Sequence, residues 1–223
     1  GEAATRLLVD HVASALFVAL LVVSAVGWLA APVIVYLTAP GFAADAAKLV
    51  LTVALLRIVF PYIAFISLTA LAGAILNTYS RFSIPAFTPV LLNVCFILFG
   101  LWLTPYFDPP VKALAWAVFC GGIAQLAFQV PFLVRLGLLP RFRLDWHDEG
   151  VWRVLRLMAP AAFGVSIAQV SLLINVVFAS FLATGSVSWL YYADRLMEFP
   201  LGIFSIALAT VILPGLSQHH ASA

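Results

Sequence analysis

Charged residues are scarce in this chain. Only 9% of its 223 residues are Asp, Glu, Lys or Arg, whereas soluble domains carry about 25%. Hydrophobic residues make up 65% of the chain, and the mean hydropathy is +1.14. This composition excludes an ordinary soluble domain and predicts an all-α, polytopic membrane protein. We expect no nucleic-acid partner.

Cysteines and the motifs of soluble enzymes are equally sparse. Cys95 and Cys120 lie in apolar runs without metal-ligand spacing, so we interpret them as small buried hydrophobes. The sequence contains no P-loop, GxGxxG, HExxH or GxSxG motif. The pair His219 and His220 is interpreted as solvated. We therefore expect no cofactor, no metal site and no enzymatic activity.

Six apolar runs are long enough to cross a membrane, which takes about 20 residues. They cover residues 12–37, 48–77, 85–103, 111–136, 157–182 and 187–213, and the second run is interrupted by Arg57 and Pro61. The one long polar segment, 135–156, divides the chain into two lobes. The chain begins with Gly1 and not with Met, so we expect an internal piece of a longer protein.

The placement of cations between these runs predicts an orientation. Seven arginines lie in the odd-numbered segments outside the runs, and two lysines lie in the even-numbered ones: Arg6, Arg81, Arg135, Arg141, Arg143, Arg153 and Arg156 against Lys48 and Lys112. Because cytoplasmic loops are enriched in Lys and Arg, the arginine-bearing segments are predicted to be cytoplasmic. Both visible ends then lie in the cytoplasm, and 183–186 is an external turn.

Three ionisable residues stand inside the sixth run, where ions are costly. These are Asp194, Arg195 and Glu198, and helical spacing puts Tyr191, Arg195 and Glu198 on one stripe that continues to Gly202 and Ser205. A guanidinium offers a permanent positive charge and a bidentate fork suited to phosphate. We interpret the stripe as facing a water-filled cavity or an anionic headgroup. The alternative is an internal ion pair that serves helix packing alone.

Other polar groups within the runs are candidates to line the same cavity. Arg57 supplies a second cation, or else snorkels outward along its stem. Gln169 and Asn175, together with Ser166 and Ser171, give the fifth run a polar seam. Hydrogen-bonded helix packing explains such a seam at least as well as contact with a ligand.

Several segments resemble the MurJ/MviN family of lipid II flippases. The similar stretches follow one another in order along essentially the whole chain: Phe60-Pro-Tyr-Ile-Ala-Phe-Ile-Ser67, Gly73-Ala-Ile-Leu-Asn-Thr78, Thr88-Pro-Val-Leu-Leu-Asn93 and Gly185-Ser-Val-Ser-Trp-Leu-Tyr-Tyr-Ala-Asp-Arg-Leu-Met-Glu-Phe-Pro200. The last stretch is the most distinctive, and it contains the charged stripe.

The resemblance implies more than composition does. Family members have about fourteen spans in two lobes of the bacterial inner membrane, and they move undecaprenyl-pyrophosphate-linked lipid II to the periplasmic leaflet by alternating access. Residues 1–136 would then hold the last four helices of the first lobe, 137–150 the inter-lobe loop, and 151–223 the first two helices of the second lobe. Asp194, Arg195 and Glu198 would line the cavity, with Arg195 on the pyrophosphate. Membrane lipids and the cell-wall synthesis machinery are the other expected partners.

Three alternatives remain open at this stage. A related flippase of lipid-linked oligosaccharides, or a drug antiporter of the same superfamily, would share the architecture. An enzyme that acts on a polyprenyl phosphate would need acidic metal ligands near the cytoplasmic face, whereas Asp194 and Glu198 lie toward the external side. A structural subunit would use Arg195 for folding only.

Overall fold

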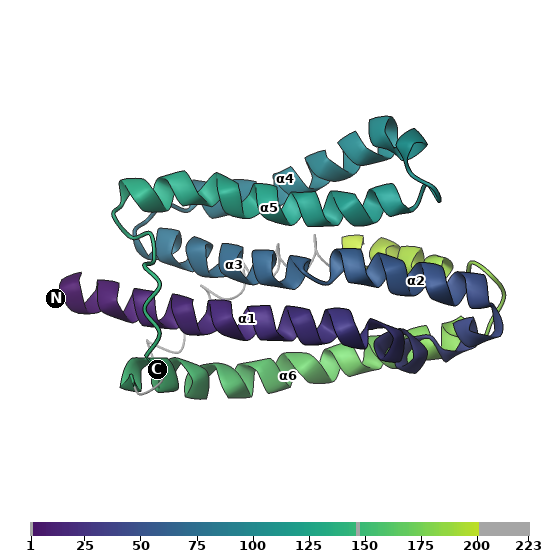
Figure 1. Ribbon diagram of the computed structural model, residues 1–223, viewed down its shortest axis with the longest axis horizontal. Helices are drawn as coiled ribbons and strands as arrows, with labels where there is room; N and C mark the ends of the chain where they lie inside the picture. The colour runs from purple at the N-terminus through teal and green to yellow at the C-terminus, as the bar shows by residue number, and fades with distance from the viewer. Residues whose placement is uncertain (1, 146–147, 201–223) are drawn as a thin grey trace, which may run out of the picture.

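The computed structural model describes residues 2–145 and 148–200 as a bundle of helices (Figure 1). No strand occurs within these ranges. In chain order the elements are α1 (Glu2–Thr38), the 3₁₀ turn η1 (Pro40–Ala44), α2 (Ala46–Val59), α3 (Tyr62–Thr78), α4 (Ser83–Leu98), the π-helical turn η2 (Phe99–Leu103), η3 (Thr104–Tyr106), α5 (Lys112–Arg135) and α6 (Glu149–Ser180). A further helix covers 186–200.

Five stretches of this bundle are long and apolar enough to cross a membrane. They are Arg6–Thr38, Ala46–Thr78, Ser83–Tyr106, Lys112–Arg135 and Glu149–Ser180. They correspond to the first five apolar runs, so the predicted all-α, multi-span fold is confirmed. The sixth run starts in the helix at 186–200, and its remainder, with Gly202 and Ser205, lies outside the described residues, as do His219 and His220.

Helix ends differ from the apolar runs that predicted them. α1 begins ten residues before the predicted start at residue 12, and α6 begins at Glu149 where residue 157 was expected. Hydropathy identifies only the apolar part of a helix, whereas the helical backbone hydrogen bonds continue into the polar residues beyond that part. Asp148 is the N-cap residue of α6. Its carboxylate accepts the backbone N–H groups of Gly150 and Val151 at 2.6 and 3.3 Å.

The second run is two helices, as its internal proline suggested. Phe60 and Pro61 form a turn between α2 and α3. Proline has no N–H to donate and its ring clashes with the preceding turn, which breaks a helix interior. Pro131 and Pro160, in contrast, lie inside α5 and α6 without ending them.

The helices are arranged in successive rows (Figure 1). α4 and α5 pack together at one edge, α2 and α3 follow end to end, and α1 separates them from α6 on the opposite side. α5 contacts α2 and α3 as well as α4, and so joins α4 to the rest of the bundle.

Close packing around α5 depends on Gly121 and Gly122. A Cβ at Gly121 would lie 2.5 Å from Leu92 of α4, and one at Gly122 would lie 2.7 Å from Tyr62. At one end of the bundle a buried cluster closes the core; its members are Ala72, Ile75 and Leu76 of α3 with Leu133 and Leu138. Cys95 and Cys120 are free thiols. Both are half buried, whereas the sequence predicted that they would be fully buried.

Candidate functional site

The helix at 186–200 begins immediately after a tight turn that glycine makes possible. Gly185 has φ +104°, a conformation that side chains with a Cβ rarely adopt. Its carbonyl then accepts the N–H of Trp189 at 2.9 Å, which is the first helical hydrogen bond there. The turn sets the start of the helix, and the helix in turn sets the relative positions of the charged residues.

Arg195 lies at the centre of the candidate site. Its Nη1 donates to Glu198 Oε2 at 2.9 Å, one helical turn away. Its Nε donates to the hydroxyl of Tyr191 at 3.3 Å, and the guanidinium stands 5.3 Å from the centre of that ring. The predicted stripe is therefore a contact group of three side chains. Asp194 lies beside it, half exposed and outside these hydrogen bonds.

Among the described residues this group is open to its surroundings. The side chains of Arg195 and Glu198 are each 62% exposed within the described part of the chain. Tyr191 and Glu198 engage two of the three guanidinium nitrogens, Nε and Nη1, while Nη2 has no hydrogen-bond partner among the described residues. An anion can therefore bind at Nη2 without first breaking the pair with Glu198.

Arg57 belongs to a different contact. Its Nε donates to the backbone carbonyl of Trp28 at 3.3 Å, and its guanidinium lies 4.9 Å from the centre of the Trp28 ring. It is half buried, between α2 and α1. The structure thus explains how Arg57 is held, and its membership of the same cavity as Arg195 stays a prediction.

Asn175 and Gln169 are both exposed on α6. Asn175 lines a cavity of about 560 Å³ between α6 and the helix at 186–200, together with Trp189 and Ala193. None of the charged stripe's residues Tyr191, Arg195 and Glu198 lines this cavity, although Ala193 precedes Asp194 in the chain. Gln169 is not among the residues that line it.

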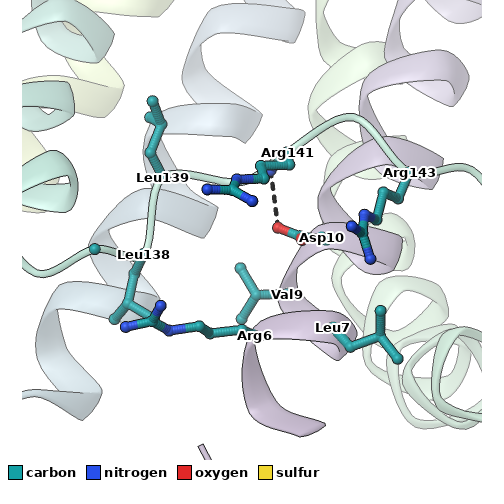
Figure 2. Close-up of a pocket in the computed structure, with 9 residues that line it drawn as sticks. Arg6, Leu7, Val9, Asp10, Leu138, Leu139, Arg141 and Arg143 are labelled. Carbon is teal, nitrogen blue, oxygen red and sulfur yellow. Dashed lines mark hydrogen bonds between the residues drawn. The ribbon is translucent and has the colours of Figure 1, made fainter. Parts of the chain in front are cut away.

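The segment that divides the predicted lobes is attached to α1 (Figure 2). Asp10 Oδ1 accepts the backbone N–H of Arg141 at 2.8 Å, and the Ser14 hydroxyl accepts that of Arg143 at 2.8 Å. A pocket of about 250 Å³ lies here, with Arg6, Arg141 and Arg143 in its wall. Residues 141–145 have no regular secondary structure, and these two hydrogen bonds hold them against α1.

A second attachment, which the sequence did not reveal, joins α1 to the start of α6. His11, which is buried, meets Asp148 with Nδ1 2.5 Å from Oδ2. The hydrogen bond with His11 lowers the pKa of Asp148 below its ordinary value, and the N–H groups of Gly150 and Val151 add to that effect. The two residues are far apart in the chain, so the only signal was an Asp directly before a helix.

The described residues contain no group of three or more His, Cys, Asp or Glu side chains that could hold a metal ion. Two buried glutamines on α5, Gln125 and Gln129, also escaped the sequence analysis. Their spacing of one helical turn inside an apolar helix was the signal that could have found them.

Comparison with known proteins gives a consistent family. The family model for lipid II flippase MurJ matches residues 1–223. A Burkholderia cenocepacia protein named lipid II flippase MurJ is 48% identical over 100% of this chain and 44% of its own length. Probable lipid II flippases MurJ of Vibrio cholerae and Haemophilus influenzae are 47% and 52% identical, over 98% and 79% of this chain and 43% and 34% of their own lengths.

The chain thus spans less than half the length of these relatives. The similarity extends through the helices and the charged stripe described above, and the family model leaves no part of the sequence unmatched. On this evidence the chain belongs to the lipid II flippase MurJ family.

Proposed function

We propose that this chain is part of a flippase of the bacterial inner membrane that moves lipid II from the cytoplasmic to the periplasmic leaflet. The match of the family model to residues 1–223 carries the proposal. Alternating access between two lobes accounts for the movement, with residues 1–136 in the first lobe, 137–150 as the link and 151–223 in the second. In this proposal the segments that bear the seven arginines and both visible ends of the chain face the cytoplasm, and 183–186 is an external turn.

Arg195 binds the pyrophosphate of the substrate. Its Nη2, which has no partner among the described residues, supports this role, since a guanidinium already held at Nε and Nη1 by Tyr191 and Glu198 has less freedom to lose when an anion binds at Nη2. Glu198 and Tyr191 position the fork, and Asp194 tunes the local charge. Arg57, Asn175 and Gln169 belong to the same transport cavity at other steps or depths.

Complementation by the intact protein tests the function and Arg195 together. The intact reading frame is expressed in a bacterium depleted of its own lipid II flippase, and lysis and outer-leaflet lipid II are measured. Arg195→Ala should abolish rescue at equal membrane levels, and Arg195→Lys should retain a part because it keeps the charge but loses the fork. Arg81→Ala, which removes an exposed arginine from the link between α3 and α4, serves as the matched control and should rescue fully.

Each pattern of rescue has a distinct meaning. Rescue by wild type and Arg81→Ala alone supports both the function and the role of Arg195. Rescue by all variants retains the function and assigns Arg195 to structure. No rescue by a normally expressed wild type would point to another lipid-linked saccharide or to a drug as substrate.

A further inference from the structure

Two glutamines of α5 fasten three helices together in the interior of the bundle. Gln125 and Gln129 are 3% and 1% exposed. Tyr62 of α3 donates its hydroxyl to Gln125 Oε1 at 3.3 Å, and Gln125 Nε2 donates to the backbone carbonyl of Thr88 in α4 at 3.4 Å. Gln129 Nε2 donates to the Thr88 hydroxyl at 2.9 Å.

These partners determine which end of each amide faces which neighbour. A carbonyl can only accept, so Gln125 must present its NH₂ to Thr88. The Thr88 hydroxyl already donates its single proton to the carbonyl of Ile84 at 2.9 Å, so it can only accept from Gln129. The oxygen of Gln129 must therefore point away from Thr88.

That oxygen is left without a partner. Gln129 Oε1 and the hydroxyl of Thr69 are both buried, and neither has a hydrogen-bond partner among the described residues. Thr69 is unusual in this respect, since Thr52, Thr78 and Thr88 each donate to the carbonyl four residues earlier in their helix. A buried acceptor and a buried hydroxyl without partners are costly to desolvate, which indicates that a third party satisfies them.

Both groups line one groove of about 330 Å³ between α3 and α4, with α5 as its floor. Its walls are mostly small residues, among them Ala70, Gly73 and Ala74. Asn77 stands at the end of α3 that joins the link to α4. Thr69 lies about 12 Å deeper along α3, at about 1.5 Å per residue, so the groove leads from the bundle end to its interior.

We propose that this groove binds water, in a short chain that runs from Asn77 to Thr69 and Gln129. A water molecule donates to Gln129 Oε1 and accepts from the Thr69 hydroxyl, which gives each buried group the partner that it needs. The volume accommodates several molecules at about 30 Å³ each. The site is independent of the substrate role of Arg195, and it would hydrate the interior of the first group of helices.

Other occupants of the groove would satisfy Gln129 Oε1 and the Thr69 hydroxyl less well. An acyl chain would fill the groove but leave Gln129 Oε1 unpaired. A monovalent or divalent cation would need several oxygen ligands, and no residue that lines the groove is a carboxylate. A water molecule supplies both a donor and an acceptor without adding charge.

Cysteine accessibility in the intact protein tests the proposal. Native cysteines are replaced, and Ala70→Cys in the groove is compared with Val90→Cys, which lies at a similar depth on α4 outside it. The probe is a membrane-impermeant, positively charged methanethiosulfonate added to open membrane fragments. Because only a hydrated thiol ionises and reacts, Ala70→Cys should react about tenfold faster than Val90→Cys.

Gln129→Leu and Thr69→Val then test the two groups that hold the water. Each is close in size to the residue it replaces, and each should slow the labelling of Ala70→Cys toward the rate at Val90→Cys. Equal rates at the two positions in the otherwise unchanged protein would overturn the proposal without reference to these variants. Fast labelling that neither substitution slows would remove Gln129 and Thr69 as the binding groups.

Discussion

The bundle of α3, α4 and α5 and the pair formed by α6 and the helix at 186–200 are built on opposite plans. The first is held by close glycine contacts and by buried amides that connect all three helices. α6 has few buried residues, and Leu157 and Phe163 on its surface are 73% and 72% exposed. Its polar ties to α1 and η1 lie at its two ends, at Asp148 and at Ser180, whose hydroxyl accepts the N–H of Gly41 at 3.0 Å.

The contrast distinguishes apolar helices that pack on one another from an apolar helix whose middle faces away from the described bundle. α3, α4 and α5 are joined by packing and hydrogen bonds among themselves, so their relative positions are determined locally. The middle of α6 presents its apolar surface outward, to lipid or to further protein, and its position depends on its ends. Charge follows the same division, because the open fork of Arg195 stands in the second region while the first keeps only neutral polar groups in its interior.

Packing at glycine should show the largest difference between the regions. Gly122→Val would overlap the side chains of Tyr62 and Phe65, since even a Cβ there lies 2.7 and 3.0 Å from them. We expect a loss of about 3 kcal/mol in the free energy of unfolding, measured by steric trapping or detergent unfolding. Gly164→Val on α6 is the matched control, because a Cβ there meets nothing within 4 Å. A similar loss in both variants would contradict the contrast.

The buried amide network should show the next largest effect. Thr88→Val preserves shape but removes the acceptor of Gln129 Nε2, leaving a buried donor unpaired. The expected loss is about 1–3 kcal/mol of unfolding free energy. Ser166→Ala on α6, which removes an exposed hydroxyl bonded to the carbonyl of Ala162, should stay within about 0.5 kcal/mol of wild type. Equal losses of unfolding free energy in Thr88→Val and Ser166→Ala would show that the buried amide network stabilises the protein no more than an exposed hydroxyl does.

The tie between α1 and α6 should depend on pH. The pKa of Asp148 lies below its ordinary value of 3.8 in the folded protein. Its stabilisation is therefore complete above that value and is lost as the pH falls through the lower, folded pKa. Thermal melts between neutral and strongly acidic pH should lose less stability in Asp148→Asn than in wild type, because the variant has already lost the carboxylate. An identical fall of the melting temperature at acidic pH in both proteins would exclude Asp148 as a source of that loss.

The smallest effect is expected at the tether of the dividing segment. Asp10→Ala removes the acceptor of the Arg141 backbone N–H and should make the segment severalfold more sensitive to limited proteolysis, with little change in melting temperature. Arg141→Ala keeps the backbone N–H and should leave the rate of cleavage near that of the wild type. The protease must not cleave at arginine, because the substitution would then remove its cleavage site. Greater sensitivity in Arg141→Ala than in Asp10→Ala would show that the side chain, and not the backbone, holds the segment.

The sequence predicted the elements better than their attachments. Apolar length identified the first five spans, Pro61 marked the break between α2 and α3, and the spacing of Arg195 and Glu198 predicted their contact, because all these signals are local. The contact of His11 with Asp148 was not predictable in this way, since it joins residues that are 137 positions apart in the chain. Whether Arg57 shares a cavity with Arg195 stays a prediction, as does the division into lobes.

The tether at α1 also has a consequence for how this segment can change over evolutionary time. Asp10 and Ser14 hold N–H groups that every amino acid except proline possesses. The path of the segment is therefore indifferent to which side chains stand at positions 141 and 143. Mutation at those two sites can alter the charge that the protein shows to its surroundings while the connection from α5 to α6 keeps the same course.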